Sequence, residues 1–195
     1  MDEESSFAQL LLQVRGGDQQ AAAKLWRDYE PYIRRTVRMR LTDSYLRRQF
    51  DSIDFCQSVM GDFFVRFALG QFDLQSPGQL VSLLTKMARN KVIDHARRQQ
   101  AARRDVRRLE AGELDDGALA GTDPTPSRVA SGKELLDLVR ARLTERDRYL
   151  AGERAAGRSW QELADELGEN ADALRMRLSR ALDRVGAEVG LSIIK

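Results

Sequence analysis

Residues 159–185 of the chain read SWQELADELGENADALRMRLSRALDRV, and this segment carries the strongest fold signal in the sequence. Its apolar residues recur at the three- and four-residue spacing of amphipathic helices on both sides of Gly168. Ser159 followed by Glu162 forms a capping box, and Asn170 is a typical N-cap residue. The pattern therefore predicts two short helices joined by a tight turn, in which Gly168 adopts a positive φ.

Two short helices around a glycine turn, with an arginine-rich second helix, are typical of the helix-turn-helix that reads a DNA major groove. With Leu174 at the centre of the buried face, a rotation of about 100° per residue directs one set of side chains outward. The candidate DNA contacts are the outward residues Asp172, Met176, Ser179, Arg180 and Asp183, flanked by Arg175, Arg177 and Arg184. The alternative is a core helix pair whose arginine face is merely solvated.

The rest of the chain is also predicted to be helical. It contains four prolines in 195 residues, and its apolar residues, 42% of the total, follow helical rather than strand-like spacing. Glycine and proline accumulate between residues 105 and 131, where this periodicity is lost and acids outnumber bases. We therefore expect an all-α protein with two small helical domains, a four-helix domain at 1–104 and a helix-turn-helix domain at 132–195, joined by a flexible acidic linker at 105–131.

Basic residues gather toward the end of the fourth predicted helix, which begins near residue 79, and these bases could neutralise nucleic-acid phosphates. The connection before that helix contains Phe72 and the proline- and glycine-punctuated residues 75–78. This connection could hold an unstacked nucleic-acid base, but the sequence alone favours a plain turn. The bases, at the end of this helix and beyond it, are Arg89, Lys91, Arg97, Arg98, Arg103 and Arg104.

The third predicted helix buries a face centred on Met60, together with Ile53. An aromatic residue among acids on the opposite face indicates a surface for protein docking, although a single exposed aromatic also occurs by chance. The side chains expected to point outward are Asp54, Phe55, Ser58, Asp62 and Val65.

The amino-acid composition limits the classes of function that the chain can have. With 32 Lys and Arg against 30 Asp and Glu, the net charge of +2 identifies no partner. Neither the single Cys56 nor the single His95 has the neighbours of a zinc site, and we expect no metal and no cofactor. Nucleophile and phosphate-loop patterns are missing, so we expect no enzyme and no small-molecule substrate. The acidic start and the lack of an 18-residue apolar run predict a cytoplasmic protein without membrane contact.

These motifs resemble those of the extracytoplasmic-function (ECF) sigma factors, the compact two-domain specificity subunits of bacterial RNA polymerase. Residues 54–59, DFCQSV, are similar to the family's region 2.2. Residues 84–98, LTKMARNKVIDHARR, are similar to the helix that meets the promoter's minus-ten element. Residues 157–182 resemble region 4, whose helix-turn-helix reads the minus-thirty-five element.

The resemblance implies a factor that directs promoter recognition, promoter melting and transcription initiation, and that is often paired with an anti-sigma factor. Its acidic linker would approach the RNA exit path of the polymerase. The polymerase core would bind Asp54, Phe55, Gln57, Ser58 and Asp62. Minus-ten DNA would meet Phe72, Gln75, Ser76, Arg89, Asn90, Lys91, Asp94, His95, Arg97 and Arg98. Minus-thirty-five DNA would meet Asp172, Arg175, Met176, Arg177, Ser179, Arg180 and Arg184.

Two other functions are compatible with the same residues. A stand-alone helix-turn-helix regulator would bind duplex DNA through the second domain alone, usually as a dimer on a palindrome. A helical scaffold would use its arginine faces only for solubility, and it would show no salt-dependent binding to DNA.

Overall fold

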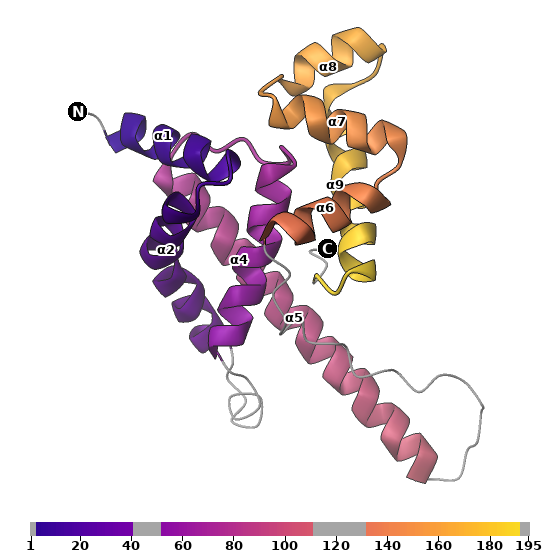
Figure 1. Cartoon of the computed structure of the whole chain (residues 1–195). Coiled ribbons are helices and arrows are strands. Elements are labelled where there is room, and N and C mark those ends of the chain that lie inside the picture. Colours follow the sequence, from indigo (N-terminus) through magenta and orange to yellow (C-terminus); the bar gives the residue numbers. More distant parts are fainter. Residues whose placement is uncertain (1–2, 41–51, 111–131, 192–195) are drawn as a thin grey trace.

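The computed structural model describes residues 3–40, 52–110 and 132–191, and these residues form eight α-helices and no strand (Figure 1). The predicted all-α class is confirmed. Within the described residues, none of the helices combines the length and apolar character needed to cross a bilayer. In chain order the helices are α1 (Glu3–Arg15), α2 (Gln19–Arg40), α4 (Ser52–Ala68), α5 (Pro77–Glu110), α6 (Gly132–Arg142), α7 (Glu145–Ala155), α8 (Trp160–Leu167) and α9 (Ala171–Glu188).

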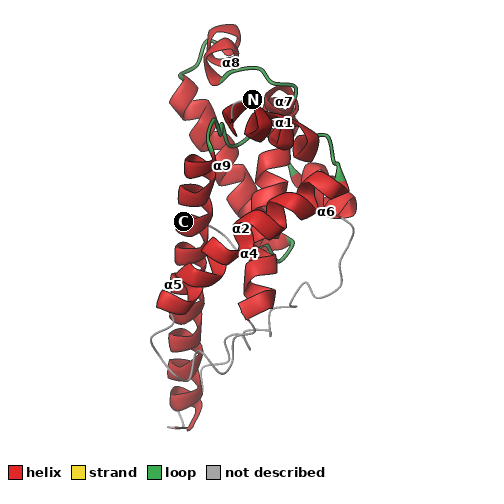
Figure 2. Cartoon of the chain, turned by 90° about the vertical axis from the view of Figure 1, so that its left-hand side faces the viewer, coloured by secondary structure: helices red, strands yellow, loops and turns green. Residues whose placement is uncertain are grey.

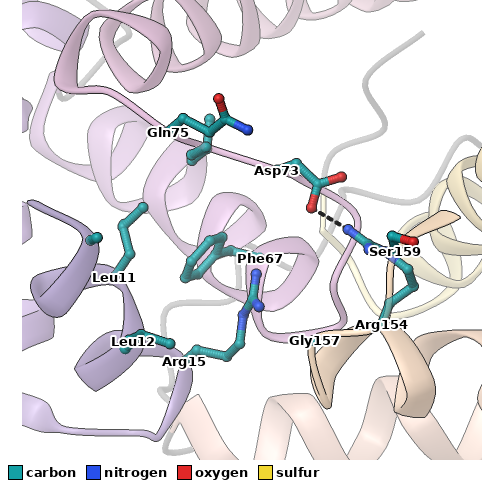
Figure 3. A pocket seen from close by; sticks show the side chains of 11 residues that line it. Leu11, Leu12, Arg15, Phe67, Asp73, Gln75, Arg154, Gly157 and Ser159 are labelled. Carbon is teal, nitrogen blue, oxygen red and sulfur yellow. Dashed lines mark hydrogen bonds and ion pairs between the residues drawn. The ribbon is translucent and has the colours of Figure 1, made fainter. Parts of the chain in front are cut away.

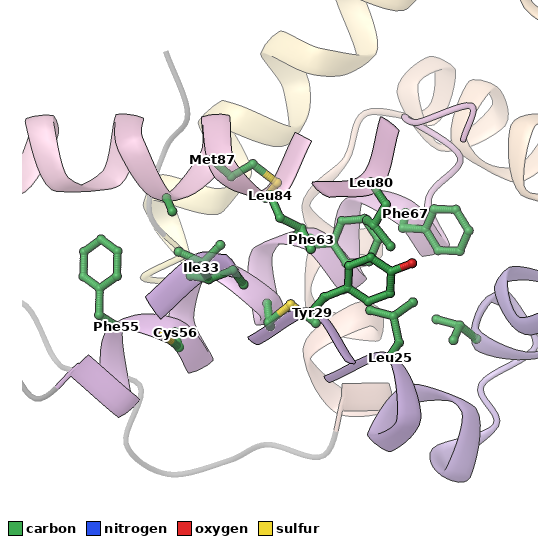
Figure 4. Close-up of a cluster of buried hydrophobic side chains, with 14 of the residues drawn as sticks. Leu25, Tyr29, Ile33, Phe55, Cys56, Phe63, Phe67, Leu80, Leu84 and Met87 are labelled. Carbon is green, nitrogen blue, oxygen red and sulfur yellow. The ribbon is translucent and has the colours of Figure 1, made fainter. Parts of the chain in front are cut away.

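Helices α1, α2, α4 and α5 form an N-terminal lobe around one apolar cluster (Figure 4). At its centre, Leu25 and Ile33 of α2, Phe63 of α4 and Leu84 of α5 are fully buried. Helix α5 is about 50 Å long, and its C-terminal half projects beyond the rest of the lobe in both views (Figures 1 and 2). A long stretch of this basic helix therefore stands clear of the core.

Helices α6 to α9 form a C-terminal lobe that contains the expected helix-turn-helix. The Ser159–Glu162 capping box opens α8, and Gly168 closes it at a φ of 65°. The Asn170 side chain caps α9 by accepting hydrogen bonds from the backbone N–H groups of the second and third helical residues. Leu174 is fully buried between α7, α8 and α9. The local features predicted for residues 159–174 are thus confirmed.

Helix α5 continues to Glu110, beyond the boundary expected at residue 104. Residues 105–110 contain neither glycine nor proline, so local propensity favours continuing the helix, which explains this difference. The rest of the expected linker, residues 111–131, lies outside the described residues. The division into two domains remains a prediction.

The two lobes touch each other. Val65 and Leu69 at the end of α4 are buried in an apolar cluster with residues of α6, α7 and α9. Helix α4 is consequently covered on one side by the N-terminal core and on another by the C-terminal lobe (Figure 1). The partners of Val65 and Leu69 in this cluster include Val139, Leu143, Ala151, Leu178, Ala181, Leu182 and Val185.

Candidate nucleic-acid interface

The exposed face of α9 carries most of the residues predicted to contact DNA. Met176, with 47% of its surface exposed, lies at the centre of this face. Asp172 and Arg175 form an ion pair of 3.0 Å at the start of the helix, and Arg180 follows one turn after Met176. The exposed members of the predicted set are Asp172, Arg175, Met176, Arg180 and Arg184, while Arg177 is half-buried.

Two residues expected on this outward face point elsewhere. The Ser179 hydroxyl accepts a hydrogen bond of 3.2 Å from the Gln71 amide, and the Asp183 carboxylate accepts one of 2.9 Å from Arg66. Both partners belong to the N-terminal lobe. The expectation that Ser179 and Asp183 face solvent is therefore wrong, because a helical wheel centred on one buried face does not include a second packing neighbour.

Two of the flanking arginines are held by a buried carboxylate. Asp147, near the start of α7, accepts a hydrogen bond of 2.8 Å from the Arg177 guanidinium and lies 3.7 Å from Arg184. Burial alone would raise the pKa of Asp147, but hydrogen bonds from Thr144 and Arg177 and the charges of both arginines outweigh burial and lower it. Asp147 thus orients two cations along the edge of the recognition helix.

The basic face of α5 is partly as predicted. Arg89 and Arg97 are exposed, and Asn90, Asp94 and His95 are half-buried. The side chains of Arg98, Arg103 and Arg104 lie outside the described residues. Arg89 is therefore exposed beside the buried Met87, Ala88 and Val92 of the packed part of α5, and Arg97 is exposed beyond them.

Lys91 does not join the exposed arginines of α5. It is only 9% exposed, and its ammonium group donates a hydrogen bond to the Ser58 hydroxyl of α4. The expectation that Lys91 contacts phosphate directly is wrong in this arrangement, because the α4–α5 packing covers it. Lys91 instead links the helix expected to bind DNA to the helix expected to bind polymerase.

In the α4–α5 connection, residues 69–76, two of the side chains predicted to contact a base are engaged within the chain. The Phe72 ring is nearly parallel to Phe63, with centroids 6.2 Å apart, and it packs on the core instead of projecting. The Ser76 hydroxyl accepts a hydrogen bond from the Gln79 N–H at the start of α5. Phe72 and Ser76 therefore have structural roles, as the plain-turn alternative predicted, whereas Gln75 is exposed.

The predicted docking face of α4 needs a larger correction. Phe55 is 6% exposed and lies in the N-terminal core with Val92 of α5, so the prediction of an exposed aromatic is wrong. Asp62 and Val65 are likewise buried, because the C-terminal lobe covers that side of α4. The side chain of Asp54 lies outside the described residues.

A different stripe of α4 is open. Ile53, which was expected in the core, is 47% exposed, and Gln57 one turn later is also exposed. The stripe continues through Gly61 and Phe64, which are half-buried. We call Ile53, Gln57, Gly61 and Phe64 the open stripe of α4.

Sequence reasoning missed the buried ion pair on the other side of α4. The Arg66 guanidinium donates to the Asp62 carboxylate at 2.7 Å, and both side chains are almost fully buried. Burial raises the pKa of Asp62, and this effect exceeds the opposing effect of the Arg66 charge. The signal was present in the sequence, since opposite charges four residues apart within an otherwise apolar segment indicate a buried pair.

A cavity of about 550 Å³ lies where α1, the α4–α5 connection and the C-terminal lobe meet (Figure 3). The Arg15 guanidinium covers the Phe67 ring at 4.8 Å on one side of it. On the other side, Arg154 lies over the Trp160 ring at 4.6 Å and forms an ion pair with Asp73. Among the described residues, no cluster of histidine, cysteine and acidic side chains is suited to hold a metal ion.

The fold and its surfaces define a helix-turn-helix protein with two packed helical lobes. A family model described as ECF sigma factor matches residues 4–189, which is nearly the whole chain. The chain therefore belongs to the ECF sigma factor family. None of the curated proteins and none of the solved structures that were compared matches it.

Family membership makes this chain an RNA polymerase sigma factor that acts in promoter recognition and transcription initiation. Its partners are the polymerase core and promoter DNA. The family consists of non-enzymatic transcription factors.

Proposed function

We propose that three exposed surfaces divide the work of initiation: α9 contacts the minus-thirty-five element, α5 contacts the minus-ten element, and the open stripe of α4 binds the polymerase core. The observation that carries this proposal is the capped helix-turn-helix whose second helix keeps an arginine-bearing stripe exposed. Such a helix fits the major groove, where its exposed side chains reach base edges and phosphates.

At the minus-thirty-five element, Arg175 and Arg180 would contact DNA on either side of Met176. Arg177 and Arg184 would contact flanking phosphates from positions fixed by Asp147. The first turn of α9 offers few groups that donate hydrogen bonds to base edges, because it holds two alanines and Asp172. We therefore infer that phosphate contacts and DNA shape supply much of the upstream affinity.

At the minus-ten element, Arg89 and Arg97 would hold the backbone of the melted strand, and Asn90, Asp94 and His95 offer polar groups between them. Gln75, exposed in the connection before α5, would contact an unstacked base. The chain then makes and breaks no bond, because melting is driven by binding to the separated strand.

For the polymerase core, the open stripe offers apolar and polar groups that are exposed at Ile53 and Gln57 and half-buried at Gly61 and Phe64. Gln57 lies at its centre between Ile53 and Phe64. Phe55 supports this surface from the core, and Ser58 is tied to Lys91 behind it. Polymerase docking would occur in the cytoplasm, and an anti-sigma factor that covers these surfaces would block it.

Reconstituted transcription tests this function. Purified bacterial core polymerase, mixed with the chain and genomic DNA fragments, should produce RNAs whose 5′ ends follow a shared upstream sequence, whereas core alone should not. Failure of the chain to co-elute with core at low salt would contradict the proposal. DNA protection by a dimer of the free chain, without polymerase, would instead support a stand-alone regulator.

A further inference from the structure

The cavity in Figure 3 belongs neither to the exposed face of α9 nor to the open stripe of α4, since none of its lining residues lies on either surface. Its volume of about 550 Å³ is typical of pockets that bind small molecules, which often form where two structural units meet. Apolar and charged side chains both line it. The apolar ones are Ala8, Leu11 and Leu12 of α1, Phe67 of α4 and Leu74 of the α4–α5 connection, and the charged ones are Arg15, Asp73 and Arg154.

The charged groups at the cavity leave one positive charge without a partner. Arg154 is engaged, because it donates to the Gly70 carbonyl oxygen at 3.1 Å and forms an ion pair with Asp73. Arg15 has no such partner among the described residues. Burial and the nearby charge of Arg154 lower the pKa of Arg15, and the charge of Asp73 opposes them. Two guanidinium groups against one carboxylate therefore favour a ligand with a single negative charge.

Arg15 also offers an unused hydrogen-bond donor. Its Nε atom is buried and has no hydrogen-bond partner among the described residues. Its guanidinium reaches from α1 over the Phe67 ring, 4.8 Å from the centroid (Figure 3). A buried donor without a partner costs free energy, so the chain gains from an acceptor at this position. A carboxylate is well suited, because its two oxygens accept a parallel pair of N–H groups from one guanidinium.

The wall next to Arg15 favours a ligand that also has an apolar part. Leu12 is 68% exposed, while Leu11 and Phe67 beside the same cavity belong to the core of the N-terminal lobe. A ligand that covered Leu12 would add the free energy of burying an apolar side chain that now faces water. Acetate lacks such a part. Inorganic phosphate lacks it too, and its second negative charge would lie close to the Asp73 carboxylate.

We propose that this cavity binds a small monocarboxylate with an apolar tail, whose carboxylate is held by Arg15 and whose tail is covered by Leu12. Arg154 contributes its charge, since its N–H groups are already engaged with Gly70, Arg158 and Asp73. Binding requires neither polymerase nor DNA, and it is measured on the free chain. Its outcome is therefore independent of the surfaces proposed for initiation.

Isothermal titration calorimetry of the full chain with octanoate tests the proposal. We expect one octanoate per chain and a Kd of about 1 mM or tighter. Octanamide keeps the tail without the charge, acetate keeps the charge without the tail, and inorganic phosphate replaces the carboxylate. Each of these three probes should bind at least tenfold more weakly than octanoate. No saturable binding of octanoate, or equal binding of octanoate and any of the three probes, would overturn the proposal.

Three variants locate the binding at this cavity. Arg15→Gln should weaken octanoate binding at least tenfold, and Leu12→Ser at least threefold. Arg27→Gln is the matched control, because it removes the same charge from an exposed arginine of α2 away from the cavity, and it should bind octanoate as the unmodified chain does. Leu12→Ser decides the question if Arg15→Gln loses its helical circular dichroism, since the Leu12 side chain is exposed and its loss leaves the core intact. Unchanged binding in Leu12→Ser, or equal weakening in Arg27→Gln and Arg15→Gln, would contradict the proposal.

Discussion

At the scale of single residues, Asp147 connects the stability of the C-terminal lobe to its DNA-binding edge. Its carboxylate accepts hydrogen bonds from Thr144 at 2.6 Å and from Arg177 at 2.8 Å, and the Arg184 guanidinium is nearby. One buried anion therefore satisfies a helix cap and orients two cations. Losing its charge would disturb both at once.

We predict that Asp147→Asn destabilises the chain by about 1–3 kcal/mol at pH 7, because two charge-assisted hydrogen bonds lose their anion. Folding lowers the pKa of Asp147, so its contribution is complete above the unfolded pKa of about 3.9 and is lost as the pH falls through the folded value. Urea unfolding of both proteins should show the difference narrowing below pH 4. Asp165→Asn is the control and should change stability little, because Asp165 is an exposed carboxylate whose hydrogen bond from Gln161 joins neighbouring turns of one helix. A difference independent of pH would contradict this role.

Gly70 offers a second test at a single residue. Gly70→Ala places a methyl group against the α7 backbone, 2.9 Å from the Ala155 nitrogen, and a helix backbone cannot yield as a side chain can. We expect the lobes to move apart, which small-angle X-ray scattering detects as a larger radius of gyration.

The control for Gly70→Ala is Gly168→Ala. Gly168 has a similar φ of +65°, but in the described part of the chain no atom apart from those of its immediate chain neighbours lies within 4 Å of its Cβ position, so this change adds only local strain of about 1–2 kcal/mol. Its radius of gyration should match that of the unmodified chain. An equal increase of the radius of gyration in both variants would mean that backbone strain at the substituted glycine, and not the contact between the lobes, determines the size of the chain.

At the scale of helices, α9 and α4 present separate surfaces, and their variants should fail in different assays. We predict that Arg180→Ala weakens holoenzyme binding to upstream promoter DNA, while binding to core is unchanged. The number of counterions released on DNA binding, measured from the slope of log K against log salt concentration, should fall by about one.

Gln57→Ala should weaken core binding and leave upstream contacts intact once the holoenzyme is formed. Co-elution with core and fluorescence anisotropy at several salt concentrations measure the two effects.

The division of labour between α9 and α4 would be contradicted by equal losses in both assays. Arg146→Ala is a suitable control for the arginine change. Arg146 is exposed on α7, and its ion pair with Glu169 stays within the C-terminal lobe. It should leave both assays unchanged.

Local signals were sufficient to predict several elements of this fold. Glycine, Ser/Thr–acid spacing and apolar periodicity predicted α8, its turn and α9, because caps and turns depend on residues close in sequence. The exposed Arg175 and Arg180 followed from the same helical wheel. In the caps, the turn and the buried stripe of these elements, sequence and structure agree.

The long-range contacts were beyond such reasoning. Phe55, Asp62, Ser179 and Asp183 were assigned to outward faces because a helical wheel assumes one buried side. Helix α4 has two buried sides. The side of α9 that packs against α4 is set by contacts between residues more than 100 positions apart in sequence, as the Arg66–Asp183 hydrogen bond shows. Periodicity reports how amphipathic a helix is, and it does not identify the helix's partner.

At the scale of the whole molecule, the chain places two DNA-binding helices, α5 and α9, on two helical lobes that pack on opposite sides of α4. The lobes share the α4 surface in the free chain, whereas the two promoter elements require them far apart.

The most direct test of the central claim is a hydroxyl-radical footprint on a promoter fragment recovered by reconstituted transcription. Core polymerase with this chain should protect two patches centred about 25 base pairs apart, and the free chain at the same concentration should protect neither. Protection of a palindrome by the free chain, unchanged when core polymerase is added, would contradict the claim.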